Sequence, residues 1–138
     1  MTVARPRSTT LTTPEIPDRP PGVRILFVED DPDTASAMSR LLTYCGHDVQ
    51  TAASVTEAVR TWSGGSFDLL ISDLGLPDGT GRDILRAIAG TEPVKAIVIS
   101  GHALDEDVQE SRSAGFAEHL IKPVSLNTLQ ATIRRVAG

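Results

Sequence analysis

The chain has little cysteine, few aromatic residues and no long apolar run. Cys45 is the one cysteine among 138 residues, so an internal disulfide is excluded and a reducing compartment, the cytoplasm, is expected. No apolar stretch approaches the roughly 20 residues that a membrane helix needs, and the amino terminus lacks the apolar core of a signal peptide. The sequence therefore predicts a cytoplasmic protein with no membrane-inserted segment.

A surplus of basic residues is also missing. The formal net charge is −5, which disfavours nucleic acid as a partner. Residues 1–22 differ from the rest because they hold five of the nine prolines, together with threonines and arginines. That composition predicts a disordered arm or linker, and residues 23–138 form one domain. The arm is either a joint to an upstream part, as in a hybrid histidine kinase, or the leader of a stand-alone regulator.

Four short apolar runs are present, and each ends on polar residues. Buried parallel strands have this pattern, and their carboxyl ends meet at one edge of an open α/β sheet. The runs and the residues that follow them are Ile25–Val28 before Glu29, Asp30 and Asp31; Leu69–Ser72 before Asp73; Ala96–Ile99 before Ser100; and His119–Ile121 before Lys122 and Pro123.

Strand and helix patterns alternate five times after the arm, which predicts a parallel sheet covered on both faces. Val49–Ala52 is the weakest strand and is placed at an edge. The first helix follows Asp33 and presents Met38, Leu41, Leu42 and Cys45 on one stripe. The other helices are predicted from Ser54 to Gly65, Arg82 to Ala89, Asp105 to Ala114 and Ser125 to Val136.

The strand ends carry a set of groups suited to phosphoryl transfer. Asp30, Asp31 and Asp73 offer the oxygen ligands that Mg²⁺ or Mn²⁺ prefers. A carboxylate can also act as the nucleophile that forms an aspartyl phosphate, while a metal and a lysine neutralise the phosphoryl charge. Asp73 is then the nucleophile and Lys122 the cation. Ser100 can donate a hydrogen bond to a phosphoryl oxygen.

The chain resembles the response-regulator receiver domains of two-component signalling. The resemblance runs from Val23 to Gly138 and depends on an ordered set of segments. These are Val28-Glu29-Asp30-Asp31, Asp73-Leu74-Gly75-Leu76-Pro77-Asp78-Gly79, Ser100-Gly101-His102 and Lys122-Pro123. It implies a flavodoxin-like, doubly wound (βα)5 fold with strand order 2-1-3-4-5. It also implies a signalling phosphoacceptor that catalyses only its own phosphorylation and dephosphorylation.

The resemblance assigns roles to individual residues. Asp73 is the phosphoacceptor, Asp30 and Asp31 are the acidic metal pair, Ser100 is the switch hydroxyl, and Lys122 contacts the phosphate. The Lys122–Pro123 peptide is expected to be cis. The carbonyl of Gly75 is a further metal ligand, and Gly75 and His102 flank the path of the hydrolytic water. The His102 imidazole either positions that water or turns outward, and His119 is either a rotameric switch or an ordinary strand histidine.

The resemblance also implies partners. The phosphoryl donor is a phosphohistidine on a sensor kinase or a phosphotransfer protein. The fourth helix, last strand and last helix form the output face and a candidate homodimer surface. A receiver without an output domain is expected. A haloacid-dehalogenase-like phosphatase is disfavoured because Gly75 stands where that enzyme needs a second acid. A P-loop nucleotide-binding protein is also disfavoured, because acids follow the first strand where a P-loop needs glycines and a lysine. A phosphorylation-independent protein-binding module is the remaining alternative.

Overall fold

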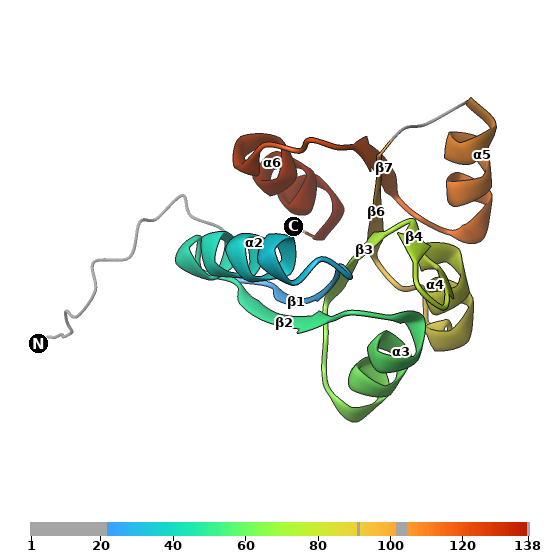
Figure 1. Cartoon of the computed structure of the whole chain (residues 1–138), viewed down its shortest axis with the longest axis horizontal. Helices are drawn as coiled ribbons and strands as arrows, with labels where there is room; N and C mark the ends of the chain where they lie inside the picture. The colour runs from blue at the N-terminus through green and yellow to red at the C-terminus, as the bar shows by residue number, and fades with distance from the viewer. Residues whose placement is uncertain (1–21, 91, 102–104, 138) are drawn as a thin grey trace, which may run out of the picture.

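A five-stranded parallel sheet forms the centre of the molecule, with helices on both faces (Figure 1). The computed structural model describes residues 22–90, 92–101 and 105–137. The predicted arm, residues 1–22, lies outside these ranges except for Gly22. The strands are β1 (Arg24–Val28), β2 (Asp48–Ala52), β3 (Leu69–Asp73), β6 (Ala96–Ser100) and β7 (Glu118–Ile121).

The strand order is β2-β1-β3-β6-β7, which is the 2-1-3-4-5 order that the resemblance implied. Every side chain of β3 and β6 is buried, because these strands lie inside the sheet and have helices on both faces. The predicted edge position of the second strand is confirmed. Four of the five residues of β2 are at least partly exposed, and Ala52 alone is buried.

Two helices cover one face of the sheet and three cover the other. The helices are α2 (Pro32–Tyr44), α3 (Val55–Gly64), α4 (Gly81–Ile88), α5 (Asp105–Ala114) and α6 (Leu126–Ala137). Leu42 of α2 and Leu129 and Ile133 of α6 pack against one face. Ala58 of α3 and Ile84 of α4 belong to the core of the other face. Successive strand residues alternate between these two cores, as the period of a strand requires.

The prediction that Leu41 faces inward is wrong. Its side chain is 42% exposed, whereas Leu42 is fully buried and Met38 is partly buried against the same core. Neighbouring residues in a helix are about 100° apart, so Leu41 and Leu42 cannot share one face. The buried stripe therefore passes through Ala35, Met38 and Leu42, at spacings of three and four.

The segment after β3 forms a small hairpin that was not predicted from the sequence. Its strands are β4 (Gly75–Leu76) and β5 (Gly79–Thr80), which pair antiparallel around Pro77 and Asp78. Two-residue strands carry too little hydrophobic pattern to be recognised from sequence. The hairpin leads directly into α4, whose first residue is Gly81.

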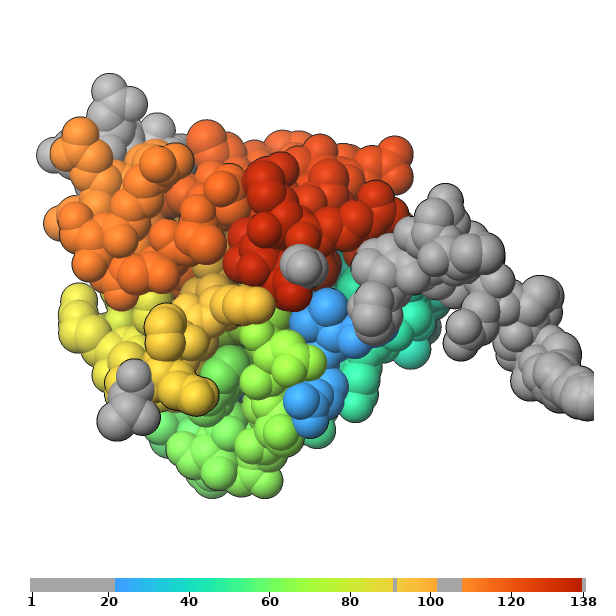
Figure 2. Space-filling model, turned by 180° about the vertical axis from the view of Figure 1, so that it is seen from behind, coloured from blue at the N-terminus to red at the C-terminus, as the bar shows by residue number. Residues whose placement is uncertain are grey.

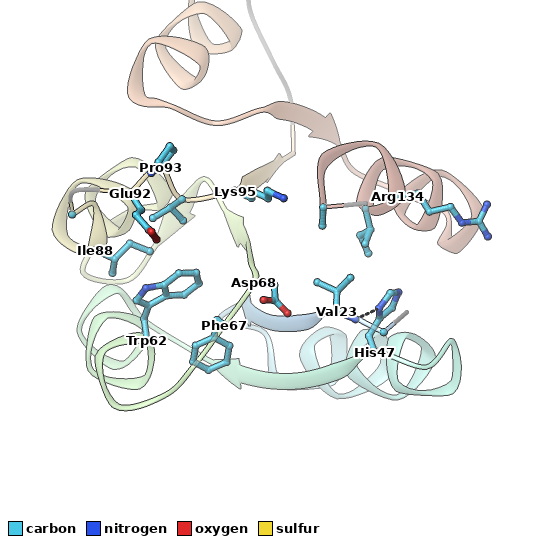
Figure 3. Close-up of a pocket in the computed structure, with 15 residues that line it drawn as sticks. Val23, His47, Trp62, Phe67, Asp68, Ile88, Glu92, Pro93, Lys95 and Arg134 are labelled. Atoms are coloured by element: carbon cyan, nitrogen blue, oxygen red, sulfur yellow. Dashed lines mark hydrogen bonds between the residues drawn. The ribbon is translucent and has the colours of Figure 1, made fainter. Parts of the chain in front are cut away.

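The amino ends of the strands open onto a groove on the side of the molecule away from the carboxyl ends. In the rear view the start of β1, in blue, reaches the surface beside α6, in red (Figure 2). The groove is lined by Trp62, Phe67, Asp68, Lys95 and Arg134, among others (Figure 3). The Trp62 and Phe67 rings stack with their centroids 5.3 Å apart.

Buried His47 links three segments beside this groove. Its Nδ1 accepts a hydrogen bond from the Val23 amide at 3.1 Å, and its Nε2 lies 2.9 Å from Oε1 of Gln130 in α6. The start of β1 is therefore held against α6. In the part of the chain that the structure describes, no helix has the length and apolar character needed to cross a membrane.

Candidate functional site

The polar residues that follow the strands converge at the carboxyl edge of the sheet. The strands are in register, so that Val28 lies beside Ser72 and Asp73 lies beside Ile99. The ends of β1, β3, β6 and β7 therefore deliver Glu29, Asp73, Ser100 and Lys122 to the same edge. This convergence is what the parallel pattern of the sequence predicted.

Asp73 is a buried carboxylate in contact with a lysine. The residue is 8% exposed, and its Oδ1 lies 3.0 Å from Nζ of Lys122. The same ammonium lies 3.1 Å from Oε1 of Glu29, which is also buried. One lysine thus bridges two carboxylates at the carboxyl ends of two neighbouring strands.

The electrostatics of this trio follow from its burial. Burial raises the pKa of Asp73 to about 7, and the hydrogen bond with Glu29 acts in the same direction. Burial would also raise the pKa of Glu29, but hydrogen bonds with Asp73, the Asp31 amide and Lys122 outweigh it and lower that pKa. Without a metal, Asp73 therefore binds a proton more readily than Glu29 does.

Three carboxylates form a cluster suited to a hard cation. Oxygen atoms of Glu29, Asp30 and Asp73 lie within 4.8 Å of one another. Two of these residues are buried while Asp30 is exposed, so a cation would contact both protein oxygens and water. Mg²⁺ usually binds in this manner, through a few carboxylates and several waters.

Asp31 has a different role in this structure. Its carboxylate caps α2, accepting hydrogen bonds from the Asp33 amide at 3.3 Å and from the Thr34 hydroxyl at 2.6 Å. Glu29, which the sequence analysis did not assign to the site, stands in the carboxylate cluster instead. Its Oε2 accepts a hydrogen bond from the Asp31 amide at 3.2 Å. The assignment of Asp31 as a metal ligand stays a prediction.

Two glycines shape the surroundings of Asp73 in different ways. A Cβ atom on Gly81 would lie 2.7 Å from the carbonyl oxygen of Asp73 and 3.1 Å from Oγ of Ser72. Glycine at this position therefore lets the start of α4 pack against the backbone of Asp73. A Cβ atom on Gly75 would meet nothing within 4 Å. The space beside Gly75 is open.

Asp78 anchors the hairpin that follows Asp73. Its Oδ1 accepts a hydrogen bond from the Val55 amide at 2.7 Å, and its Oδ2 accepts from the amide and the hydroxyl of Thr56 at 3.0 and 2.9 Å. These amides belong to the first turn of α3, where unpaired N–H groups attract an anion. A capping box between Thr80 and Asp83 fixes the start of α4.

Ser100 belongs to a line of three polar side chains. Its Oγ lies 2.7 Å from Nε2 of His119, and Nδ1 of the same ring lies 3.1 Å from Oγ of Ser111 in α5. Ser111 is fully buried, and Ser100 is 7% exposed. The structure thus connects the two predicted switch residues and adds a third residue on a helix.

The remaining predicted site residues are placed as follows. The peptide bond between Lys122 and Pro123 is cis. His102 lies outside the described residues. Sequence reasoning missed Glu29, Gly81 and Ser111 as members of the site. Glu29 adjoins the two acids that were chosen, and Gly81 follows Gly79 in a recognisable Gly-Thr-Gly segment, whereas a lone serine in a helix carries no signal.

The comparisons with known proteins agree with this geometry. Residues 25–134 match the response regulator receiver domain family, and the chain belongs to that family. It is therefore a receiver domain, a signalling phosphoacceptor rather than an enzyme with a separate substrate. Membership sets aside the dehalogenase-type phosphatase.

Individual relatives are moderately similar. The chain is 34% identical over 119 residues to the transcriptional regulatory protein TcrA of Mycobacterium tuberculosis, covering 84% of this chain and 46% of the relative. It is 31% identical over 110 residues to KdpE, a transcriptional regulatory protein of the same organism, covering 80% and 49%. The non-phosphorylated HemR receiver domain of Leptospira biflexa superimposes with a TM-score of 0.77 at 29% identity, covering 84% and 94%. The chain spans less than half the length of these two curated relatives.

Proposed function

We propose that Asp73 accepts a phosphoryl group from a phosphohistidine on a sensor kinase or a phosphotransfer protein. The single observation that carries this proposal is the buried Asp73 carboxylate, which lies 3.0 Å from the Lys122 ammonium and within the acidic cluster. A bond forms between a carboxylate oxygen of Asp73 and phosphorus while the P–N bond of phosphohistidine breaks. The released imidazole takes up a proton. Lys122 stabilises negative charge on the phosphoryl oxygens.

A divalent cation, Mg²⁺ or Mn²⁺, fits the cluster. When bound, it would neutralise charge on the phosphoryl oxygens and on the acids. Asp30 and Asp73 are proposed ligands, together with the carbonyl of Gly75. Glu29 and Asp31 compete for the remaining protein ligand position, since Glu29 lies in the cluster and Asp31 was predicted from the sequence.

Phosphorylation is proposed to switch a protein-interaction surface. Ser100 is the last residue of β6 and Lys122 follows β7, so a phosphoryl group on Asp73 that contacts both would shift the ends of these strands. His119 and Ser111 connect Ser100 to α5. The surface of α5, β7 and α6 is therefore the proposed output face and the proposed surface of a homodimer.

The test of the acceptor uses a small-molecule phosphodonor. Incubation with acetyl phosphate and Mg²⁺ should add one phosphoryl group to the chain, measured by intact mass. Asp73→Asn should abolish the addition, because an amide is not a nucleophile toward phosphorus. Asp68→Asn, at the opposite end of β3, is the matched control and should be modified normally. Full modification of Asp73→Asn at the wild-type rate would overturn the proposal.

The test of the metal ligands separates Glu29 from Asp31. Asparagine caps helices about as well as aspartate, so Asp31→Asn preserves the cap of α2 while it removes the charge. If Asp31 is a ligand, Asp31→Asn should weaken Mg²⁺ binding strongly, as measured by titration calorimetry. If Glu29 is the ligand, Glu29→Gln should do so instead. Chelation should block phosphorylation in either case.

The lifetime of the phosphorylated state tests the two flanking positions. We propose that His102 modestly assists hydrolysis, so that His102→Ala lengthens the lifetime several-fold, below the ~10²–10⁴ of a fully engaged general base. Gly75→Lys or Gly75→Glu should also change the lifetime, since a side chain there would enter open space beside the acceptor. An unchanged rate in His102→Ala, with altered rates in the Gly75 variants, would assign the control to Gly75 alone.

A further inference from the structure

The groove at the amino ends of the strands is a second concave site, at the opposite end of the sheet from Asp73. Its volume is about 690 Å³, within the ~300–1,000 Å³ of ligand-binding clefts. Figure 3 shows Val23 and His47 at one end of the groove and Trp62 and Pro93 at the other. The groove therefore extends from the start of β1 to an aromatic end.

The aromatic end of the groove is apolar and incompletely covered. The Trp62 and Phe67 rings stack with their centroids 5.3 Å apart, and both side chains stay partly exposed. Ile88 is also partly exposed, and Pro93 is exposed. Exposed apolar surface in a groove is typical of a binding site. Aromatic-lined grooves suit proline-rich segments, because such segments already have the extended polyproline conformation.

The chain enters the described structure at the other end of the groove. Gly22, the first described residue, lines the groove, and a Cβ atom there would overlap the carbonyl oxygen of Gly46. The Val23 amide donates to Nδ1 of His47 at 3.1 Å, and the Val23 carbonyl accepts from the Asp48 amide at 3.0 Å. These contacts fix the entry point, so the segment that precedes Gly22 starts at the groove.

That segment has the composition that an aromatic-lined groove binds. Residues 14–21 read Pro-Glu-Ile-Pro-Asp-Arg-Pro-Pro, with four prolines and the apolar Ile16. In the polyproline conformation these eight residues would span roughly 25 Å. Proline has a fixed φ angle and loses little backbone freedom, so docking such a segment costs less conformational entropy than docking a flexible one.

The charged side chains that line the groove leave a positive excess. Asp68 is paired with Arg24 at 3.1 Å. In the part of the chain that the structure describes, three further charged residues line the groove and form no ion pair: Lys95, Arg134 and Glu92. With the Arg24–Asp68 pair balanced, two cations therefore face one anion.

The segment carries the opposite excess, because Glu15 and Asp18 outnumber Arg19. We propose that residues 14–21 dock in this groove of the same chain, with Ile16 and the prolines against the aromatic end and the acids toward the basic residues. Complementary charge orients the segment, while the apolar contacts hold it. A segment that cannot fold alone can order on binding in this way. The proposal does not depend on phosphorylation of Asp73.

The experiment uses the full chain and its single tryptophan. Trp62 is the one tryptophan, so its emission reports on the groove. Ile16→Asp puts a charge into the proposed apolar contact and should shift the emission to longer wavelength and increase quenching by acrylamide. Leu11→Asp, outside the segment, is the matched control and should behave as wild type. No shift in Ile16→Asp, or an equal shift in both variants, would overturn the proposal.

The role of charge is tested with two double variants that raise the net charge equally. Removing both acids, with Glu15→Gln and Asp18→Asn, should shift the Trp62 emission in the same direction as Ile16→Asp. The control, Ser8→Lys with Thr9→Lys, should leave the emission unchanged. High salt should act like removal of the acids, because salt screens exposed charges. Unchanged emission in all three cases would overturn the charge-directed placement.

Dilution and isotope-mixed NMR identify the occupant of the groove. The Trp62 emission should not depend on protein concentration, because docking within one chain is a first-order process. A nuclear Overhauser effect between the Trp62 indole N–H and the Ile16 methyl groups should appear in uniformly labelled protein. It should vanish between chains in a mixture of 15N-labelled and 13C-labelled protein. An effect between chains would make a second copy the occupant, and no effect in either sample would leave the groove to another protein; both results overturn the proposal.

Discussion

The two ends of the same sheet hold carboxylate–cation contacts of similar length but opposite exposure. At the amino end, Arg24 and Asp68 are 3.1 Å apart, and their side chains are 50% and 43% exposed. At the carboxyl end, Lys122 lies 3.0 Å from Asp73, whose side chain is 9% exposed. Water screens the Arg24–Asp68 pair, so this pair contributes little to the free energy of unfolding beyond holding the start of β1. In the second pair Asp73 is shielded from water while the Lys122 side chain is 40% exposed, and burial raises the pKa of Asp73.

The composition of the two ends differs as well. Asp68 accepts hydrogen bonds from several N–H groups of Arg24, and Lys95 adds a second positive charge nearby. At the carboxyl end Glu29 and Asp73 share the single cation Lys122. Two buried carboxylates against one ammonium are costly to folding. The carboxyl end of this sheet therefore holds buried negative charge that the proposed cation and phosphoryl chemistry would use, whereas the amino end holds an exposed ion pair.

The largest stability change is expected at Gly81. Gly81→Ala places a Cβ atom 2.7 Å from the Asp73 carbonyl, so the start of α4 must shift. We expect a loss of about 1–3 kcal/mol in the free energy of unfolding, as in overpacked cores, together with slower phosphorylation. Urea denaturation measures the first effect. Gly64→Ala, where a Cβ meets nothing within 4 Å, is the control. Equal stability of the Gly81→Ala and Gly64→Ala variants would show that the close approach of Gly81 to the Asp73 carbonyl does not require glycine.

Asp73→Asn should stabilise the metal-free protein in a pH-dependent manner. The folded pKa of Asp73, about 7, lies above its ordinary value of 3.8. The folded state therefore binds the proton more tightly, and stability is lost as pH rises between these two values. Relative to wild type, Asp73→Asn should be equally stable near pH 3.5 and more stable by about 1–3 kcal/mol above pH 7.5. Thermal unfolding in a chelator measures this.

Two outcomes would contradict this account of the carboxyl end of the sheet. A stability difference between wild type and Asp73→Asn that does not change with pH would mean that the burial of Asp73 imposes no electrostatic cost. Added Mg²⁺ should stabilise wild type more than Asp73→Asn, because a ligand that binds only the folded state shifts the equilibrium toward it. Equal stabilisation of both proteins would place the cation elsewhere.

A smaller effect is expected at Asp78, which is exposed but still lies at the carboxyl end. Hydrogen bonds from the Thr56 and Val55 amides lower the pKa of its carboxyl group. Its contribution is therefore present above pH 3.8 and is lost as pH falls through the lowered value. Asp78→Ala should accelerate hydrogen exchange at these two amides near neutral pH. Unchanged exchange would show that Ser54 alone caps α3.

The smallest effect is expected at the amino end. Arg24→Ala removes an exposed pair that solvent screens, so the denaturation midpoint should change by a small fraction of the Gly81→Ala change. Phosphorylation should proceed at the wild-type rate, because Arg24 lies at the opposite end of β1 from Glu29. A large loss of stability in Arg24→Ala, or slower phosphorylation, would contradict the proposed difference between the two ends of the sheet.

Much of the fold could be predicted because its signals are local. Fully buried strands such as Leu69–Asp73 appear as apolar runs, and the weak second strand marks an edge of the sheet. Helices were located to within a few residues by their spacing and caps. Leu41 was misplaced because spacing alone did not show which of two adjacent leucines faces the sheet. The hairpin of β4 and β5 was missed because it is too short to have a pattern.

The sequence by itself determined the alternation of strands and helices, and with it the convergence of Asp73, Ser100 and Lys122 at one edge. That result needs only chain order and the geometry of parallel strands. The tertiary structure alone decided which acids meet. Asp31 is turned to cap α2 while Glu29 reaches Lys122, and Ser111 meets His119 across a helix and a strand. Side-chain direction depends on packing between segments far apart in the chain, and no local pattern records it.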